Sequence, residues 1–206
     1  MIIDGKTIAE AIDTGLWKAW RNEKVLESKD LKISTNSVDL TLGSKMLVPV
    51  CHDKLIDPSK DTLEWREVLP DNGKYYFLPG QFALAVAQER FDVSNPVPVF
   101  LWEDLKTEGK RTFMYCAPMF EGRSTTARLG LATHVTAGYG DYGFAGNFTM
   151  ELVNHGPLGL ILSVGMRIAQ LSFHVVTPRV REIRYTGAYA GKIGGPFPPT
   201  LGQGRF

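Results

Sequence analysis

An alternation of apolar and polar residues with a period of two constrains the fold of this chain more than any other feature of its sequence. The segment FTMEL (148–152) places its apolar residues at every second position, and QLSFHV (170–175) does the same. Successive side chains of a β-strand point to opposite faces of a sheet, so both segments predict strands with one buried face. The 21 glycines and 12 prolines supply the turns that many short strands need. The chain is therefore predicted to be mostly β.

A short N-terminal helix and a first strand precede these segments. Thr7 and Glu10 have the spacing of a capping box at the start of a helix, and Gly15 would end that helix. We expect one face of the helix to pack against the body of the protein. Residues 38–42 alternate and predict a strand that stops in a turn at Gly43.

Glycine and proline divide the remaining segments. In the apolar run 75–87, Pro79 and Gly80 separate two predicted strands. The charged segment 103–112 has no periodicity and predicts a surface loop or hairpin insertion. Residues 187–206 are rich in glycine and proline, and they predict a flexible tail that becomes ordered only against another surface.

The length of 206 residues favours a single domain over residues 1–206. We predict an N-terminal helical segment over 1–30, a β core over 31–184 and a C-terminal tail over 185–206. With 23 basic and 22 acidic residues the net charge is +1, which argues against a nucleic-acid-binding protein. No stretch approaches the roughly 18 apolar residues of a membrane-spanning helix, so no membrane partner is expected.

The N-terminus and the cysteines predict a cytoplasmic protein. The first residues carry acids and lack the apolar run of a signal peptide. Cys51 and Cys116 have no CxxC spacing, so a disulfide framework is not expected and each cysteine is predicted to be a small buried hydrophobe. A reducing compartment fits this cysteine usage.

Residues 121–154 contain the densest group of side chains suited to chemistry. Arg123-Ser124-Thr125, followed by Arg128, offers two guanidinium groups and two hydroxyls. Guanidinium groups match the geometry of phosphate oxygens and hydroxyls add neutral donors, so this segment is a candidate phosphate site. The alternative is a pair of surface arginines in a turn.

Glu151 and Asp141 are the candidate acids of this region. Glu151 stands on the polar face of a predicted strand whose other face is core, so its carboxylate needs either a partner or a chemical role. An ion pair with Arg128 would supply the partner. Asp141 lies in a glycine-rich turn, where it either forms the turn or provides a hard oxygen for a magnesium–phosphate complex or an attacking water.

Several common kinds of catalytic site are disfavoured by the sequence. It contains no GxxxxGK[ST] and no GxGxxG between a strand and a helix, which disfavours a P-loop or dinucleotide fold. The motifs of zinc deaminases are missing, so no zinc site is expected. Ser124, His134 and Asp141 would form a triad without a GxSxG elbow, and we expect His134 to be a structural histidine in the middle of a strand.

Seven stretches of the chain carry a family resemblance. The strong ones are GRSTTARLGL (122–131), HVTAG (134–138), DYGFAGNFTMELVN (141–154) and GMRIAQLSF (165–173); the weaker ones are SVDLTLG (37–43), LPGQFALA (78–85) and YTGAYAGKIGGP (185–196). In order and spacing they resemble the dCTP deaminase branch of the dUTPase superfamily, over most of the chain. The resemblance implies a distorted β-barrel or jelly-roll subunit of the dUTPase-like (β-clip) type, a homotrimer, and active sites between subunits.

The resemblance also implies roles for individual residues. Glu151 falls on the catalytic glutamate, whose carboxylate can take a proton from a water attacking C4 of cytosine. Arg128 and Ser124 fall on residues that position the water and pyrimidine and stabilise the transition state. Asp141 falls on the aspartate that orients the attacking water in dUTPases. The implied nucleotide-binding residues are Arg123, Ser124, Thr125, Arg128, Val135, Thr136, Ala137, Asp141, Gln170, Tyr185 and Lys192.

The activity implied by the resemblance is metal-independent hydrolytic deamination of dCTP to dUTP and ammonia, in the supply of dUMP and dTTP. Magnesium would be bound through the triphosphate, and dTTP would be a feedback inhibitor. Tyr139 and Phe144 resemble residues of bifunctional members, which also hydrolyse dUTP to dUMP and pyrophosphate, whereas Asp141 occurs in both branches. Two alternatives are a dUTPase or dCTP pyrophosphatase without deamination and a non-catalytic nucleotide-binding regulatory protein.

Some features depart from the family pattern. Thr125 stands where a second serine is usual and keeps the hydroxyl, and Tyr142 replaces a common proline. In the tail, Ala188 occupies the place of a phosphate-binding lysine and Lys192 that of a glutamine, which leaves the preferred number of phosphates open. The stretch 97–119 is longer than the family pattern predicts.

Overall fold

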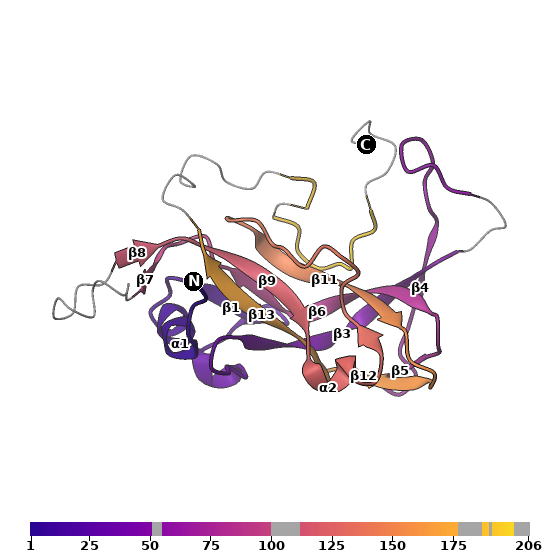
Figure 1. The fold of residues 1–206 in the computed structure, drawn as a ribbon, viewed down its shortest axis with the longest axis horizontal. Helices are drawn as coiled ribbons and strands as arrows, with labels where there is room; N and C mark the ends of the chain where they lie inside the picture. Colours follow the sequence, from indigo (N-terminus) through magenta and orange to yellow (C-terminus); the bar gives the residue numbers. More distant parts are fainter. Residues whose placement is uncertain (51–54, 100–111, 177–186, 190, 200–206) are drawn as a thin grey trace.

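The computed structural model describes residues 1–50, 55–99, 112–176, 187–189 and 191–199 (Figure 1). In chain order its elements are α1 (Gly5–Asp13), β1 (Lys18–Arg21), β2 (Lys24–Val25), the 3₁₀-helix η1 (Ser28–Asp30), β3 (Val38–Pro49), β4 (Trp65–Val68), β5 (Lys74–Phe77), β6 (Phe82–Asp92), β7 (Val97–Val99), β8 (Thr112–Met114), β9 (Cys116–Gly122), α2 (Ser124–Ala127), β10 (Leu131–Ala132), β11 (Ala145–Asn154), β12 (Leu160–Ser163) and β13 (Arg167–Val175).

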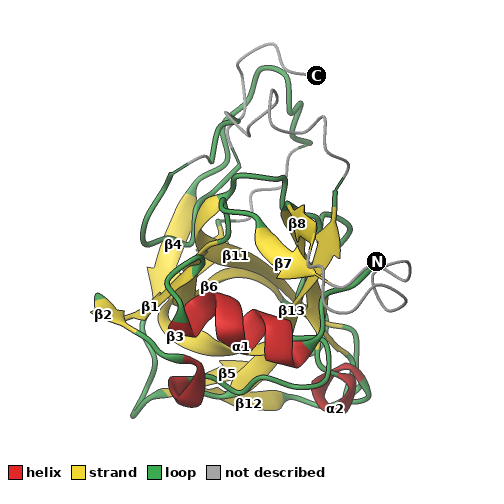
Figure 2. Ribbon diagram, turned by 90° about the vertical axis from the view of Figure 1, so that its left-hand side faces the viewer, coloured by secondary structure: helices red, strands yellow, loops and turns green. Residues whose placement is uncertain are grey.

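A nine-stranded sheet forms the body of the molecule, which confirms the prediction of a mostly-β chain. Its main path runs β10-β11-β6-β3-β13-β9, with β1, β2 and β4 attached beside it. β5 with β12 and β7 with β8 form separate two-stranded sheets. Helix α1 lies across the strands (Figure 2) and buries Ile8 and Ile12 in the core. Trp17, just after the helix, packs on Phe173 of β13 with ring centroids 4.7 Å apart.

The described strands do not close into the barrel that the family resemblance implies. β10 and β9 are the two ends of the sheet path. Because β10 has only two residues, the chain soon leaves the sheet in the segment 133–144. From that segment Tyr139 forms an isolated bridge to Met119 of β9. The described architecture is therefore an open, mostly-β fold.

Helix α1 begins earlier than the predicted capping box. Asp4 is its N-cap: the carboxylate accepts hydrogen bonds from the backbone N–H groups of Lys6 at 2.9 Å and Thr7 at 3.0 Å. Thr7 therefore lies inside the first turn, and the predicted Thr7–Glu10 capping box is wrong. An aspartate caps as well as serine or threonine, so the carboxylate at position 4 takes the free N–H groups first. Gly15 has a φ of 74°, which agrees with the predicted end of the helix.

Strand β3 passes through Gly43 without turning. Gly43 lies so close to β6 that an added Cβ would be 2.8 Å from the carbonyl oxygen of Val86. The pairing of β3 with β6 shifts register between Leu42 and Met46, so the glycine marks an irregularity within one continuous strand. The predicted turn is wrong because a glycine in a strand can serve a close backbone approach instead of a turn.

The strands predicted within 75–87, 148–152 and 170–175 are confirmed. Pro79 and Gly80 separate β5 from β6. Alternate residues of β11 are buried, and Met150 and Leu152 are 0% exposed. Leu171 is equally buried in β13. The two-residue period therefore predicted which faces of these strands form the core.

Some predictions fall partly outside the described residues. Cys116 is a buried free thiol, as predicted, and burial raises its pKa to about 12; Cys51 lies outside the described ranges. Of the predicted loop 103–112, only Thr112 is described, and it begins β8. In the described part of the chain no helix is long and apolar enough to cross a membrane.

The described part of the C-terminal tail lies along β11 (Figure 1). The backbone N–H of Gly194 donates to the Asn147 side-chain oxygen at 3.0 Å. The N–H of Phe197 donates to the Thr149 hydroxyl at 3.2 Å. The surface that orders this part of the tail is therefore the polar face of the chain's own β11.

Candidate functional site

A cavity of about 510 Å³ opens beside the polar face of β11. Its other walls are formed by the end of β3 and the start of β4, by the first residues of β6, by the segment after β10 and by the C-terminal tail. Its lining residues are Pro49, Leu63, Trp65, Phe82, Leu84, Ala137, Tyr139, Gly140, Asp141, Phe144, Asn147, Phe148, Thr149, Glu151, Tyr189, Phe197 and Pro199.

Glu151 is the carboxylate that β11 contributes to this cavity. Its Oε2 accepts a hydrogen bond from the backbone N–H of Val135 at 2.9 Å, and its own N–H donates to the Thr133 carbonyl at 3.0 Å. Within the described residues it forms no ion pair, and the alternative of a pair with Arg128 is not realised. The Arg128 guanidinium donates instead to the carbonyl of Ser124 at 3.1 Å. A carboxylate that is fixed by one N–H and borders a cavity can exchange a proton with a bound molecule.

The segment after β10 forms the wall facing Glu151. Val135, Thr136 and Ala137 are exposed, and Ala137 and Asp141 line the cavity. The backbone carbonyl of Asp141 accepts a hydrogen bond from the N–H of Phe144 at 3.1 Å, as in a β-turn. The exposed Asp141 carboxylate has no partner among the described residues. Asp141 therefore forms the turn and also presents its carboxylate to the cavity.

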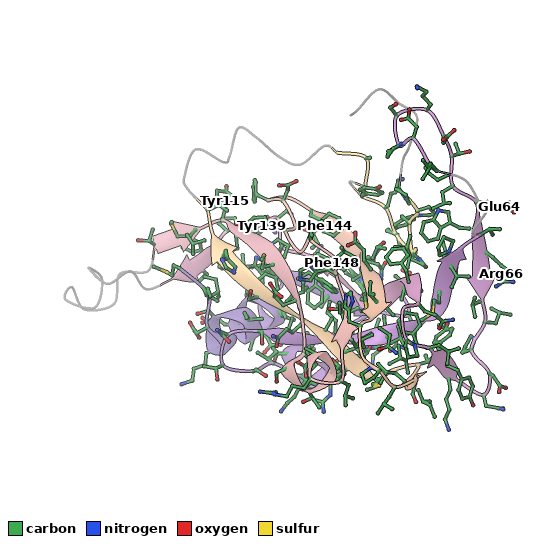
Figure 3. All side chains as sticks on the ribbon, turned by 45° about the vertical axis from the view of Figure 1, so that its right-hand side comes forward. Glu64, Arg66, Tyr115, Tyr139, Phe144 and Phe148 are labelled. Atoms are coloured by element: carbon green, nitrogen blue, oxygen red, sulfur yellow. The ribbon has the colours of Figure 1, made fainter. Side chains whose placement is uncertain are left out.

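Aromatic side chains form much of the cavity wall. The ring centroids of Trp65 and Phe82 are 6.2 Å apart, and those of Phe144 and Phe148 are 4.9 Å apart. Figure 3 shows Tyr139 close to Phe144 and Phe148. Such a wall suits a planar ring such as a nucleobase. The sequence did not indicate Trp65, Phe82 or Phe148 as site residues. Phe148 was assigned to the core, because it lies on the apolar face of β11.

The tail adds two more rings to the cavity, from Tyr189 and Phe197. The Lys192 ammonium lies 5.2 Å from the Tyr189 ring centroid and 5.4 Å from that of Phe197, within the range of cation–π contacts. Lys192 is exposed and does not itself line the cavity. Tyr185 lies outside the described residues.

Helix α2 carries the phosphate candidates outside this cavity. Arg123 is its N-terminal flanking residue, and Ser124, Thr125 and Arg128 are exposed on or next to it. None of these residues is among those that line the cavity. Within one chain, the structure therefore does not bring the phosphate candidates to Glu151.

Arg123 is held instead by the buried carboxylate of Asp39. Arg123 Nε lies 3.3 Å from one oxygen of Asp39, and Arg167 Nη1 lies 3.3 Å from the other. Gln170 pairs with Asp39 across β13 and β3 and donates its side-chain N–H to the Gly122 carbonyl at 3.3 Å. The structure thus places Gln170 and Arg123 in one polar cluster. Sequence reasoning missed Asp39 and Arg167, because their charges are far apart along the chain.

His134 does not form a triad with Ser124 and Asp141. It lies just after β10, not within a strand, and its Nε2 is 3.3 Å from Glu121 Oε2. The predicted position in a strand is therefore wrong, because β10 ends at Ala132. Among the described residues, no three His, Cys, Asp or Glu side chains form a group that could hold a metal ion.

Comparison with known proteins identifies a matching family and several relatives of this chain. The model of the dCTP deaminase-like family matches residues 2–101 and 111–176. A "dCTP deaminase, dUMP-forming" from Coprothermobacter proteolyticus is 32% identical over 169 residues, which cover 80% of this chain and 81% of the relative. A protein of the same name from Methanobrevibacter smithii is 33% identical over 183 residues, which cover 85% of this chain and 81% of that relative.

A solved structure supports the fold. The 2'-deoxycytidine 5'-triphosphate deaminase from Agrobacterium tumefaciens matches with a TM-score of 0.55 at 16% identity. The match covers 85% of this chain and 48% of that chain, so this chain spans about half the length of the solved protein. With the match of the family model over most of the sequence, the chain belongs to the dCTP deaminase-like family.

Proposed function

We propose that the protein converts dCTP and water to dUTP and ammonia, and then hydrolyses dUTP to dUMP and pyrophosphate. The observation that carries the proposal is the Glu151 carboxylate, which borders an aromatic-lined cavity and, in the described part of the chain, has no cationic partner. The relatives named "dCTP deaminase, dUMP-forming" support the same pair of reactions.

Deamination requires a base that can return the protons it takes. Glu151 would accept a proton from a water molecule as the water oxygen bonds to C4 of cytosine, and C4 becomes tetrahedral. One proton of the water then passes to N3 and the other to the amino group. The bond between C4 and the amino nitrogen breaks, ammonia departs, and the water oxygen becomes the carbonyl oxygen at C4. The Val135 N–H, 2.9 Å from Oε2, would hold the carboxylate in place during these transfers.

The second reaction would use Asp141. Its exposed carboxylate borders the same cavity, and it would orient a water toward the α-phosphate of dUTP; pyrophosphate leaves as the phosphorus–oxygen bond breaks. Magnesium would arrive with the triphosphate as part of the substrate. The backbone of 135–137 would face the pyrimidine edge, and Lys192 would meet the phosphate chain from the tail.

We further propose that the active unit is a homotrimer whose sites lie between subunits. One chain holds Glu151 in the cavity but carries Ser124 and Arg128 on the exposed helix α2, so a second copy would have to supply these two residues. Leu158 and Ile161, which follow the turn packed against the end of α2, are 70% and 57% exposed. A subunit contact here would bury this apolar surface.

Resolving the products of dCTP in the presence of magnesium tests the proposal. Ammonia together with dUMP and pyrophosphate is the expected result. Ammonia with dUTP as the final product would limit the activity to deamination. Release of dCMP without ammonia would contradict deamination and indicate a pyrophosphatase. Binding of dCTP without any turnover would indicate a non-catalytic nucleotide-binding protein.

A further inference from the structure

Two guanidinium groups share one buried carboxylate at the edge of α2. The Asp39 side chain is 4% exposed, and its two oxygens each lie 3.3 Å from a different arginine, Arg123 and Arg167. Arg123 directly follows β9 and Arg167 begins β13, which lies between β9 and the strand that carries Asp39, β3. The carboxylate therefore fixes the two guanidinium groups side by side.

This cluster has one more positive charge than negative charge. Within the described residues, no second carboxylate pairs with either Arg123 or Arg167. Their side chains remain 29% and 45% exposed, so both can reach a ligand. Two like charges held together repel each other unless an anion lies between or beside them. The cluster is thus preorganised for a further anion.

The position of the cluster indicates which anion this would be. Arg123 directly precedes Ser124 and Thr125, whose exposed hydroxyls are candidate phosphate donors. The Arg123 Nη1 also donates to the backbone carbonyl of Arg167 at 3.4 Å, which ties the two arginines together. Paired guanidinium groups beside free hydroxyls match the several oxygens of a polyphosphate better than a single carboxylate.

We propose that Arg167 and Arg123 form a clamp for the phosphate chain of the nucleotide and that Asp39 is the positioning residue of this clamp. The inference rests on the proposed function and adds Arg167, which would let the site distinguish triphosphates from monophosphates. Asp39 makes no contact with the nucleotide; it removes the rotational freedom of two long side chains before the phosphates arrive.

Binding of inorganic tripolyphosphate, measured calorimetrically, tests the clamp without relying on catalysis. Arg167→Gln should weaken tripolyphosphate about tenfold and raise the KM for dCTP by a similar factor with little change in kcat. The preference for dCTP over dCMP should shrink accordingly. Arg167→Lys should retain part of the affinity, and Asp39→Asn should weaken tripolyphosphate like Arg167→Gln. Arg66→Gln is the matched control, because Arg66 is exposed on β4, which lies away from α2 (Figures 1 and 2).

The outcomes separate this clamp from the proposed function. Unchanged tripolyphosphate affinity and unchanged KM in Arg167→Gln would overturn the clamp, even if the wild type deaminates dCTP. If the wild type binds tripolyphosphate but does not deaminate dCTP, and Arg167→Gln weakens this binding, the clamp is upheld and the proposed function is refuted. If Asp39→Asn does not fold, the two Arg167 variants still decide the matter, since Arg167 is half-exposed.

Discussion

Two glutamates on the neighbouring strands β11 and β6 show that the role of a carboxylate depends on its surroundings. Glu151 accepts one hydrogen bond from a backbone N–H and borders a cavity. Glu89 is 0% exposed, and it accepts hydrogen bonds from Arg21 at 2.7 and 3.0 Å and from the Thr41 N–H at 2.8 Å. Glu89 has its full set of partners and is structural, whereas Glu151 keeps capacity for a ligand.

Glu151→Gln should abolish deamination while nucleotide binding remains. An amide cannot take up the proton of the attacking water, so the rate of ammonia release should fall by at least about a hundredfold. A coupled ammonia assay and calorimetric binding of dCTP measure the two effects. Glu67→Gln, which changes an exposed residue of β4, is the control and should keep the wild-type rate of ammonia release. Ammonia release by Glu151→Gln at the wild-type rate would refute the role given to Glu151.

Glu89→Ala should destabilise the protein by about 3 kcal/mol, because it leaves the partly buried Arg21 guanidinium and the Thr41 N–H without a partner. Urea unfolding followed by tryptophan fluorescence measures the loss. The exposed Glu67→Ala is the control and should change the free energy of unfolding by less than about 0.5 kcal/mol. Equal stability of the two variants would show that the Glu89 network contributes nothing.

At the scale of single elements, helix α1 shows why local motifs predict the existence of an element better than its ends. The helix and its end at Gly15 follow from apolar spacing and glycine. The sequence offers two possible N-caps for this helix, Asp4 and Thr7, and the structure uses Asp4. The role of Gly43 is equally hard to predict from local sequence. A glycine is needed there because β6, which is distant along the chain, packs closely against it.

Asp4→Ala should lower the stability of the helix end by about 1 kcal/mol at neutral pH. Burial opposes the charged form of Asp4, but hydrogen bonds from Thr7 and Lys6 outweigh it and lower the pKa of the carboxyl below 3.8. The ionised cap therefore contributes its full stability above pH 3.8, and this is lost as the pH falls through the lower folded pKa. Chemical unfolding at pH 7 and near pH 3 should show the difference between wild type and variant shrink at the acidic pH.

A constant difference at both pH values would mean that the charge of Asp4 plays no part in the cap. Glu64→Ala serves as the control, since Glu64 is an exposed carboxylate outside the helix. It should show no such pH-dependent change.

At the scale of the whole molecule, the candidate residues fall into two groups. Glu151, Asp141 and Ala137 border the cavity, whereas Arg123, Ser124, Thr125 and Arg128 lie on or next to α2. A single domain, inhibition by dTTP and the trimer stay predictions. The division into two groups is the structural reason to expect that more than one copy builds each site.

Mixing two inactive variants tests this arrangement. Glu151→Gln and Arg128→Gln should each be inactive alone, and co-expression should restore activity. In trimers of random composition about one quarter of the sites would combine an intact Glu151 with an intact Arg128 from a neighbour. Deamination by the co-expressed protein, with the mass of the assembly from light scattering, is the measurement. No recovery in a confirmed mixed trimer would place both residues in the same subunit's site.

The sequence by itself determined the mostly-β class, the buried faces of β11 and β13 and the short region that holds the candidate acids, because a two-residue period and local composition are properties of neighbouring residues. The tertiary structure decided what depends on residues distant in the chain. It showed that the described sheet stays open, that tail and hairpin aromatics line one cavity with Glu151, and that Asp39 draws Arg123 and Arg167 together. Packing, charge pairing and burial act across space, and a linear pattern does not contain them.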